Sequence, residues 1–297
     1  MGSRTATREG GALAALALWL VACGGEPPPP PAYPPPPEEA TEVEVVPPEE
    51  PAEATEPAEE AAAEPATPPV QVVPAERTPL QEGEKPSLRI LAPRNGQRLR
   101  PGKLLVRLRV RGWELQPAPG RHVHLILDNE PYWAIRDASK PIDLLALLKE
   151  RGKELTEGTH VLRAFPSRHH HESVKEGTPF ALVVFHYGKK SQDFAFDPQA
   201  PLLTYSRPKG CYPPGERILL DFYVSNAELG EGKHRVRYAI DGEVQGEITQ
   251  WTPHYIEHLP EGEHTVRLTL LGPDGQPVAG PFNDTERTIR VVQDCGH

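Results

Sequence analysis

Residues 123–130 read VHLILDNE, and residues 236–243 read VRYAIDGE. In the first stretch Val123, Leu125 and Leu127 recur at every second position, which is the period of a strand with one face in an apolar core. Each stretch then reaches an Asp-Asn or Asp-Gly pair, residue types that tolerate the positive φ of a tight hairpin turn. The two stretches therefore predict the same strand and turn, used twice in one chain.

Two further pairs of segments repeat in the same order along the chain. Residues 155–163 read LTEGTHVLR, and residues 259–267 read LPEGEHTVR. The pattern of prolines, glycines and leucines in residues 86–110 also recurs in residues 201–224. Because three blocks recur collinearly, we expect two copies of one module of about 100 residues.

Within each copy, turn-forming residues separate about seven short runs that are rich in β-branched and aromatic side chains. This pattern is typical of an all-β sandwich, and the order of the runs resembles immunoglobulin-like and fibronectin-like modules of exported bacterial proteins. The resemblance implies two tandem sandwiches, over residues 86–190 and 198–297. Residues 141–151 depart from it, since their leucines and strong helix formers predict a short helix inserted in the first module.

A different composition marks residues 23–85. They hold fifteen glutamates, two basic residues and eighteen of the chain's 37 prolines, and the net charge of the whole chain is −10. Proline fixes φ and removes a hydrogen-bond donor, and glutamates repel one another, so this segment predicts a disordered, extended linker. The residues from 86 onward are close to neutral, so the acidic charge belongs to the linker and says little about what the modules bind.

The first residues have the features of an export signal. Two arginines precede an apolar run over residues 11–22, which is too short to span a bilayer. The run leads into Leu-Val-Ala-Cys, ending at Cys23, which resembles the lipobox of bacterial lipoproteins. The resemblance implies that residues 1–22 are a signal peptide and that Cys23 carries acyl chains such as palmitate. It also implies an outer-membrane lipoprotein, exposed to the periplasm or at the cell surface.

The same resemblance bears on the two remaining cysteines. With Cys23 lipidated, Cys211 and Cys295 are left as a pair in an exported, oxidising setting, where disulfides form and persist. We therefore expect a disulfide between them. The alternative is two free, buried thiols.

Histidines of the first copy are the candidate metal ligands. His122 and His124 lie two residues apart on a predicted strand and so share one face, and His160 follows in the same copy. Neutral imidazoles gathered on one face can bind zinc or copper. The alternative is a plain polar face of solvated or hydrogen-bonded side chains, because Arg235 and Arg237 flank the equivalent position in the second copy.

Other histidines favour a structural interpretation. His160 and His264 occupy equivalent positions after a Glu-Gly turn, and a residue shared by both copies more often serves the fold than an activity of one copy. The three consecutive histidines at 169–171 follow Pro-Ser-Arg and are expected in an exposed loop.

Aromatic residues supply a second kind of candidate site. Tyr132, Trp133 and Trp251 offer rings that could stack on the sugar rings of a glycan. The alternative is that these side chains fill the cores of the sandwiches.

The sequence contains none of the common catalytic motifs, such as a nucleophile elbow or a phosphate-binding loop. We therefore expect neither an enzyme nor a cofactor, and near-neutral modules do not favour nucleic acid. The predicted function is that of an outer-membrane-anchored lipoprotein, a non-catalytic binding or structural module of the cell envelope. Its predicted partners are the membrane, through the lipid anchor, and an envelope protein or glycan. The alternative is a periplasmic metal-binding (copper or zinc) or chaperone-like protein that uses the first module's histidines.

Overall fold

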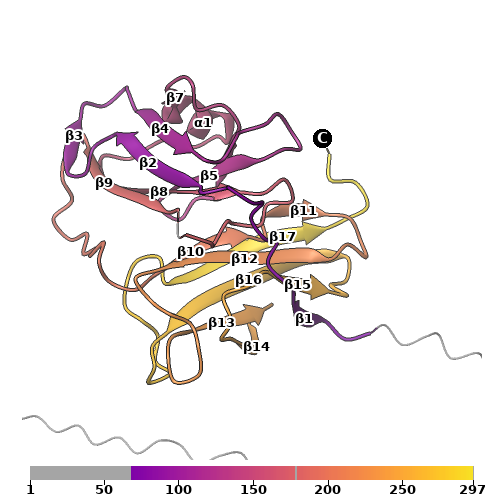
Figure 1. Ribbon diagram of the computed structural model, residues 1–297. Coiled ribbons are helices and arrows are strands. Elements are labelled where there is room, and N and C mark those ends of the chain that lie inside the picture. The colour runs from indigo at the N-terminus through magenta and orange to yellow at the C-terminus, as the bar shows by residue number, and fades with distance from the viewer. Residues whose placement is uncertain (1–67, 178, 297) are drawn as a thin grey trace, which may run out of the picture. The chain divides into compact units, whose positions relative to one another are not determined.

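The computed structural model describes residues 68–177 and 179–296 (Figure 1). In chain order the elements are β1 (Gln71–Pro74), β2 (Ser87–Ala92), β3 (Gln97–Leu99), β4 (Leu105–Arg111), β5 (His122–Leu127), β6 (Trp133–Ile135), β7 (Ile142–Asp143), α1 (Leu144–Glu150), β8 (Gly158–Ser167), β9 (Ala181–Tyr187), β10 (Leu202–Arg207), β11 (Gly210–Tyr212), β12 (Ile218–Ser225), β13 (Arg235–Ile240), β14 (Glu243–Ile248), β15 (His254–Glu257), β16 (Gly262–Leu271) and β17 (Asp284–Val291). Within these residues no helix has both the length and the apolar character needed to cross a membrane.

The strands form four sheets, two in each half of the described chain. The sheet orders are β2-β4-β7 and β3-β9-β8-β5-β6 in the first half, and β1-β15-β12-β10 and β11-β17-β16-β13-β14 in the second. Strands β2 to β9 therefore pair with one another in the same order as β10 to β17, and β15 pairs in addition with β1. In each half one ladder is parallel, β3 with β9 and β11 with β17. The predicted copies are thus tandem immunoglobulin-like sandwiches of one topology, which confirms the all-β fold class.

Each sandwich has its own apolar core between its two sheets. Val123, Leu125 and Leu127 of β5 lie in the first core, as the alternation along the strand predicts. Val236 of β13 and Leu268 of β16 lie in the second. Burial of one such side chain stabilises the fold by roughly 1.5–3 kcal/mol, so the alternating positions account for much of what holds the sheets together.

The helix expected in the first sandwich is α1, which lies between β7 and β8. Asp143 caps its N-terminus, because its carboxylate accepts hydrogen bonds from the backbone N–H groups of Leu145 and Ala146. Leu144 and Leu148 are buried in the first core. The leucines that predicted the helix therefore also anchor it to the sandwich.

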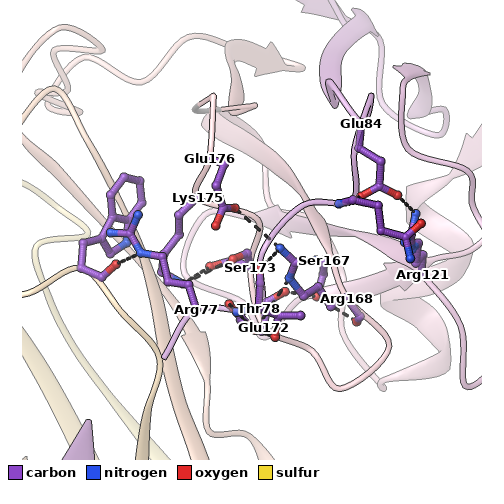
Figure 2. Close-up of polar contacts among 12 residues, drawn as sticks. Arg77, Thr78, Glu84, Arg121, Ser167, Arg168, Glu172, Ser173, Lys175 and Glu176 are labelled. Carbon is purple, nitrogen blue, oxygen red and sulfur yellow. Dashed lines mark hydrogen bonds and ion pairs between the residues drawn. The ribbon is translucent and has the colours of Figure 1, made fainter. Parts of the chain in front are cut away.

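The linker boundary predicted at Lys85 is wrong, because ordered structure begins earlier. Strand β1 pairs antiparallel with β15 at the edge of the second sandwich. Farther along, Thr78 Oγ1 donates to the carboxylate of Glu172 at 2.6 Å, and Arg168 donates to the Thr78 carbonyl (Figure 2). The prolines of the segment that contains β1 do not prevent it from docking, because a sheet edge offers unpaired backbone groups to any extended segment. The segment thus contacts both sandwiches.

The expected disulfide is present in the second sandwich. Cys211 of β11 is bonded to Cys295, 84 residues later and beyond the end of β17. Because β11 pairs with β17, the two cysteines come together at one edge of this sandwich. The bond ties the segment after β17 back to β11.

An apolar interface joins the two sandwiches. Ile126, Tyr132 and Phe165 of the first sandwich pack together with Tyr223 of the second, and all four side chains are buried. The ring centroids of Phe165 and Tyr223 are 5.0 Å apart in a stacked arrangement. This contact covers the face of β5 that does not meet the first core.

Buried polar contacts cross the same interface. Lys175 Nζ lies 2.5 Å from Asp221 of β12, and neither side chain is more than 1% exposed. Ser173 Oγ donates to the same carboxylate at 3.1 Å and accepts from Lys175 at 2.8 Å. Elsewhere Arg163 of β8 donates to Thr204 Oγ1 at 2.9 Å. These contacts fix the alignment of the two sandwiches as well as their separation.

Replacing Asp221 by asparagine should destabilise the protein by about 3–5 kcal/mol, because the ammonium of Lys175 would remain buried without its counter-charge. The free energy of unfolding, measured by denaturant titration, tests this. The exposed pair of Lys233 and Glu228 is the matched control, and Glu228→Gln should leave stability unchanged within error. Equal, small effects of both substitutions would contradict the role given to the buried pair.

Candidate functional site at the junction of the sandwiches

The histidine face of β5 lies at the interface. His122 and His124 share one face as predicted. Both are fully buried and both make hydrogen-bond contacts, so of the alternative interpretation the solvated face is wrong and the hydrogen-bonded face is confirmed. The second sandwich covers this face: His124 Nδ1 is 3.0 Å from Ser206 Oγ of β10. The ring of His124 also stacks on Tyr132, with centroids 3.4 Å apart.

A third histidine, His171, joins this pair from the loop after β8. Its Nδ1 lies 2.9 Å from His122 Nε2, which is itself 3.0 Å from His124 Nε2. His171 was expected in an exposed loop, yet it is half-buried and has a left-handed backbone conformation with φ of 71°. Within the part of the chain that the structure describes, these three residues form the one group of histidine, cysteine or carboxylate side chains whose ligand atoms converge. His171 belongs to this group only because the loop after β8 folds back toward β5, and strand periodicity gives no signal for such a loop conformation.

All three imidazoles of this cluster are held neutral. Burial, together with nearby cations that include Arg207, lowers the pKa of His122 to about 4 and that of His171 to about 2. Burial also lowers the pKa of His124 well below its usual value. Neutral rings leave lone pairs free to bind hydrogen or a metal ion.

His160 does not belong to the cluster, although it was predicted to join His122 and His124. Its Nδ1 lies 2.8 Å from the Asp128 carboxylate, and its Nε2 lies 2.9 Å from the Thr156 carbonyl. His264 makes the same two contacts in the second sandwich, with Asp241 at 2.7 Å and the Pro260 carbonyl at 2.9 Å. Both histidines therefore brace the turn that each repeat contains.

The aromatic candidates do not form a surface platform. Tyr132 is fully buried at the interface, and Trp133 lies in the first core. Trp251 is half-buried and packs against the second core, and its indole N–H donates to the Phe222 carbonyl at 3.1 Å. The prediction that these rings stack on a glycan is therefore wrong, because the interface and the cores occupy their faces.

A pocket of about 730 Å³ opens beside the histidine cluster. Its lining residues come from the loop after β8 and from the second sandwich: His170, His171, Arg207, Cys211, Tyr212, Pro213, Glu216, Arg217, Leu219, Tyr255, Gln293, Asp294 and Cys295. His171 thus belongs to both the cluster and the pocket wall, and the disulfide forms another part of that wall.

Arg207 is the unusual charge of this pocket. Its Nη1 donates to the Tyr212 hydroxyl at 3.0 Å, and its buried Nε has no partner among residues 68–177 and 179–296. The ion pairs found within these residues do not include Arg207, whereas the neighbouring Arg217 pairs with Glu257 at 2.6 Å. Sequence analysis did not single out Arg207, because nothing local distinguishes it from other arginines.

The predicted lipidation site, Cys23, and the predicted signal peptide lie outside the described residues, as does most of the predicted linker.

Comparisons with known proteins give likenesses to solved structures. No protein-family model matches the chain. No curated protein matches it either. Fibronectin(III)-like modules of CbhA from Clostridium thermocellum are 16% identical with a TM-score of 0.25, covering 69% of this chain and 93% of theirs. A second likeness is to the SGBP-B protein of a Bacteroides ovatus mixed-linkage glucan utilization locus, in complex with a mixed-linkage heptasaccharide. It is 14% identical with a TM-score of 0.20, covering 69% of this chain and 47% of that chain. The central fibronectin-III array of RIM-binding protein is 10% identical with a TM-score of 0.24, covering 70% of this chain and 69% of that chain.

The contacts of His160 predict a pH-dependent contribution to stability. Burial disfavours its imidazolium, but the carboxylate of Asp128 and the Thr156 carbonyl outweigh burial and raise its pKa. The stabilisation is therefore fully present below the unfolded-state pKa of about 6.5 and is lost as pH rises through the higher folded-state pKa. Unfolding free energies of the unmodified protein and His160→Asn should differ more at pH 5.5 than at pH 9. A difference independent of pH would contradict this.

Proposed function

We propose that the protein is an exported, lipid-anchored binding protein of the cell envelope that takes an acidic ligand, such as an acidic glycan, into the pocket beside β10. The lipobox-like sequence ending at Cys23 supports the anchor, and the disulfide between Cys211 and Cys295 fits an oxidising compartment. On this proposal the anchor sits in the outer membrane, and the two sandwiches act without catalysis.

The observation that carries the ligand class is the guanidinium of Arg207, which has no carboxylate partner among residues 68–177 and 179–296. A charge that is half-buried without a carboxylate is costly, and a carboxylate on a ligand would remove that cost with charge-assisted hydrogen bonds. The two acidic residues of the lining, Glu216 and Asp294, are exposed and therefore better hydrated than Arg207. The interior of the pocket is thus more cationic than its rim.

Tyr255 gives the pocket wall a half-buried aromatic ring, with the Arg217 guanidinium 4.6 Å from its ring centroid. Tyr212 is buried in the second core and holds Arg207 by its hydroxyl. Rings with an apolar body and a polar end suit sugars, which expose both C–H and hydroxyl groups. An acidic sugar combines the two chemistries that the wall offers.

The anchor is tested by Cys23→Ser in cells that process lipoproteins. The protein should move from the membrane fraction to the soluble fraction, since each buried methylene of an acyl chain contributes about 0.8 kcal/mol to membrane binding. Cys211→Ser removes a different cysteine and should leave partitioning unchanged. Retention of Cys23→Ser in the membrane fraction would contradict the anchor.

The ligand class is tested by calorimetric titration with oligogalacturonate, an acidic sugar chain, and with neutral malto-oligosaccharide. Oligogalacturonate should bind and the neutral chain should not. Arg207→Gln should weaken binding by about 10- to 100-fold, because a hydrogen bond to a charged group is worth about 1.5–3 kcal/mol.

Arg217→Gln is the matched control, because Arg217 lines the same pocket but already has a carboxylate partner. It should change the affinity far less than Arg207→Gln. Equal binding of the acidic and neutral chains, or an unaltered affinity in Arg207→Gln, would overturn the assignment.

A further inference from the structure

The three buried histidines have a geometry of their own, which does not depend on the pocket's ligand. We infer that His122, His124 and His171 form a metal site that takes a monovalent copper ion in preference to zinc. Metal–imidazole bonds of about 2.0–2.1 Å place ligand nitrogens about 3.3–3.6 Å apart. The two closest nitrogen pairs are 2.9 and 3.0 Å apart, so small movements of the rings would admit the ion.

Hydrogen bonds on the far sides of the rings orient them for this role. His122 Nδ1 lies 3.0 Å from the Gly120 carbonyl, which can only accept, so this nitrogen carries the hydrogen and Nε2 presents a lone pair. The ring nitrogens of His124 and His171 both approach that one lone pair. Ser206 holds the other nitrogen of His124. The carbonyl behind His122 and the hydroxyl behind His124 are the kind of support that metal-binding histidines ordinarily have.

The surrounding charge selects the valence of the ion. Arg136 Nη1 is 3.4 Å from His122 Nδ1, and the Arg207 guanidinium is 5.4 Å from the ring of Tyr132, which stacks on His124. Lys209 lies over the same tyrosine, but burial and Arg207 lower its pKa to about 7, so the arginines contribute most. Coulomb repulsion is proportional to the charge of the ion, and the cluster contains no carboxylate. A divalent ion is therefore repelled twice as strongly as a monovalent one.

Imidazole suits copper and zinc alike, so the preference for copper(I) rests on the surrounding charge and on the number of ligands. Zinc usually completes a tetrahedral shell with a fourth ligand. The pocket provides a route for the ion, because His171 lies in its wall.

Comparison of the two sandwiches shows that the fold itself does not require these histidines. In the second sandwich Arg235 and Arg237 flank the equivalent strand position, and both pair with Glu247, at 2.7 and 3.0 Å. Moreover, His171 has a φ of 71°, a conformation that costs energy for any residue with a Cβ. The turn at this residue brings its ring against His122.

The test uses the full chain with Cys23→Ser, which removes the one cysteine outside the disulfide. Under ascorbate and without oxygen, the protein competes with the coloured chelator bicinchoninate for copper(I). One copper ion per chain should be taken from the chelator. His171→Ala should weaken copper binding by about 100-fold or more, since even outer partners of a ligand change affinity by about 10- to 100-fold. His170→Ala, its neighbour in the same loop, is the matched control and should bind as the parent does.

Zinc titration against a chromophoric zinc chelator tests the valence. Zinc should bind at least about tenfold more weakly than copper(I), and Arg207→Gln should narrow that difference because it removes one cation. Failure to remove copper from bicinchoninate, unaltered binding in His171→Ala, or tighter binding of zinc would overturn the inference. Should His171→Ala lose its thermal unfolding transition, X-ray absorption of the copper-loaded parent decides: three imidazole nitrogens support the site, and fewer overturn it.

Discussion

Burial of both faces of β5 is the constraint on which the rest of the structure depends. One face carries Val123, Leu125 and Leu127 into the core of the first sandwich, and the other is covered by the second sandwich. Polar side chains on the covered face lose water and must find partners. His122 and His124 find them in the Gly120 carbonyl, in Ser206 and in each other. The interface therefore turns an ordinary polar strand face into a buried, hydrogen-bonded cluster.

Beside the apolar contact and the buried ion pair, cations that donate to uncharged oxygens also cross the same interface. Arg163 donates to the Leu203 carbonyl and to Thr204, and Arg287 donates to the Glu130 carbonyl. Carbonyl dipoles satisfy the hydrogen bonds of a guanidinium without cancelling its charge. On our proposals, the positive charges of such guanidinium groups favour an acidic ligand in the pocket and disfavour a divalent ion at the histidines. Both proposals follow from this one electrostatic property.

Local features of the fold were predictable from sequence because each depends on neighbouring residues. Strand alternation, the turns at Asp128 and Asp241, and the leucine-rich helix α1 all follow from patterns a few residues long. The repeat also predicted a structural role for His160 and His264, because they occupy equivalent positions in both copies. In the structure they brace equivalent turns. The docked strand β1 was missed, since its composition resembles the linker before it and its partner, β15, lies about 180 residues away in the chain.

The sequence by itself determined two copies of an all-β module, the inserted helix, the cysteine pair and the shared face of His122 and His124. Only the tertiary structure decided that this face is buried, that His171 and not His160 completes the cluster, and that Arg207 lies beside it with no carboxylate partner in the described part of the chain. The physical reason is the range of the interactions. Periodicity and turn chemistry act along the chain, whereas burial and charge at the junction depend on side chains brought together from two separately folded cores.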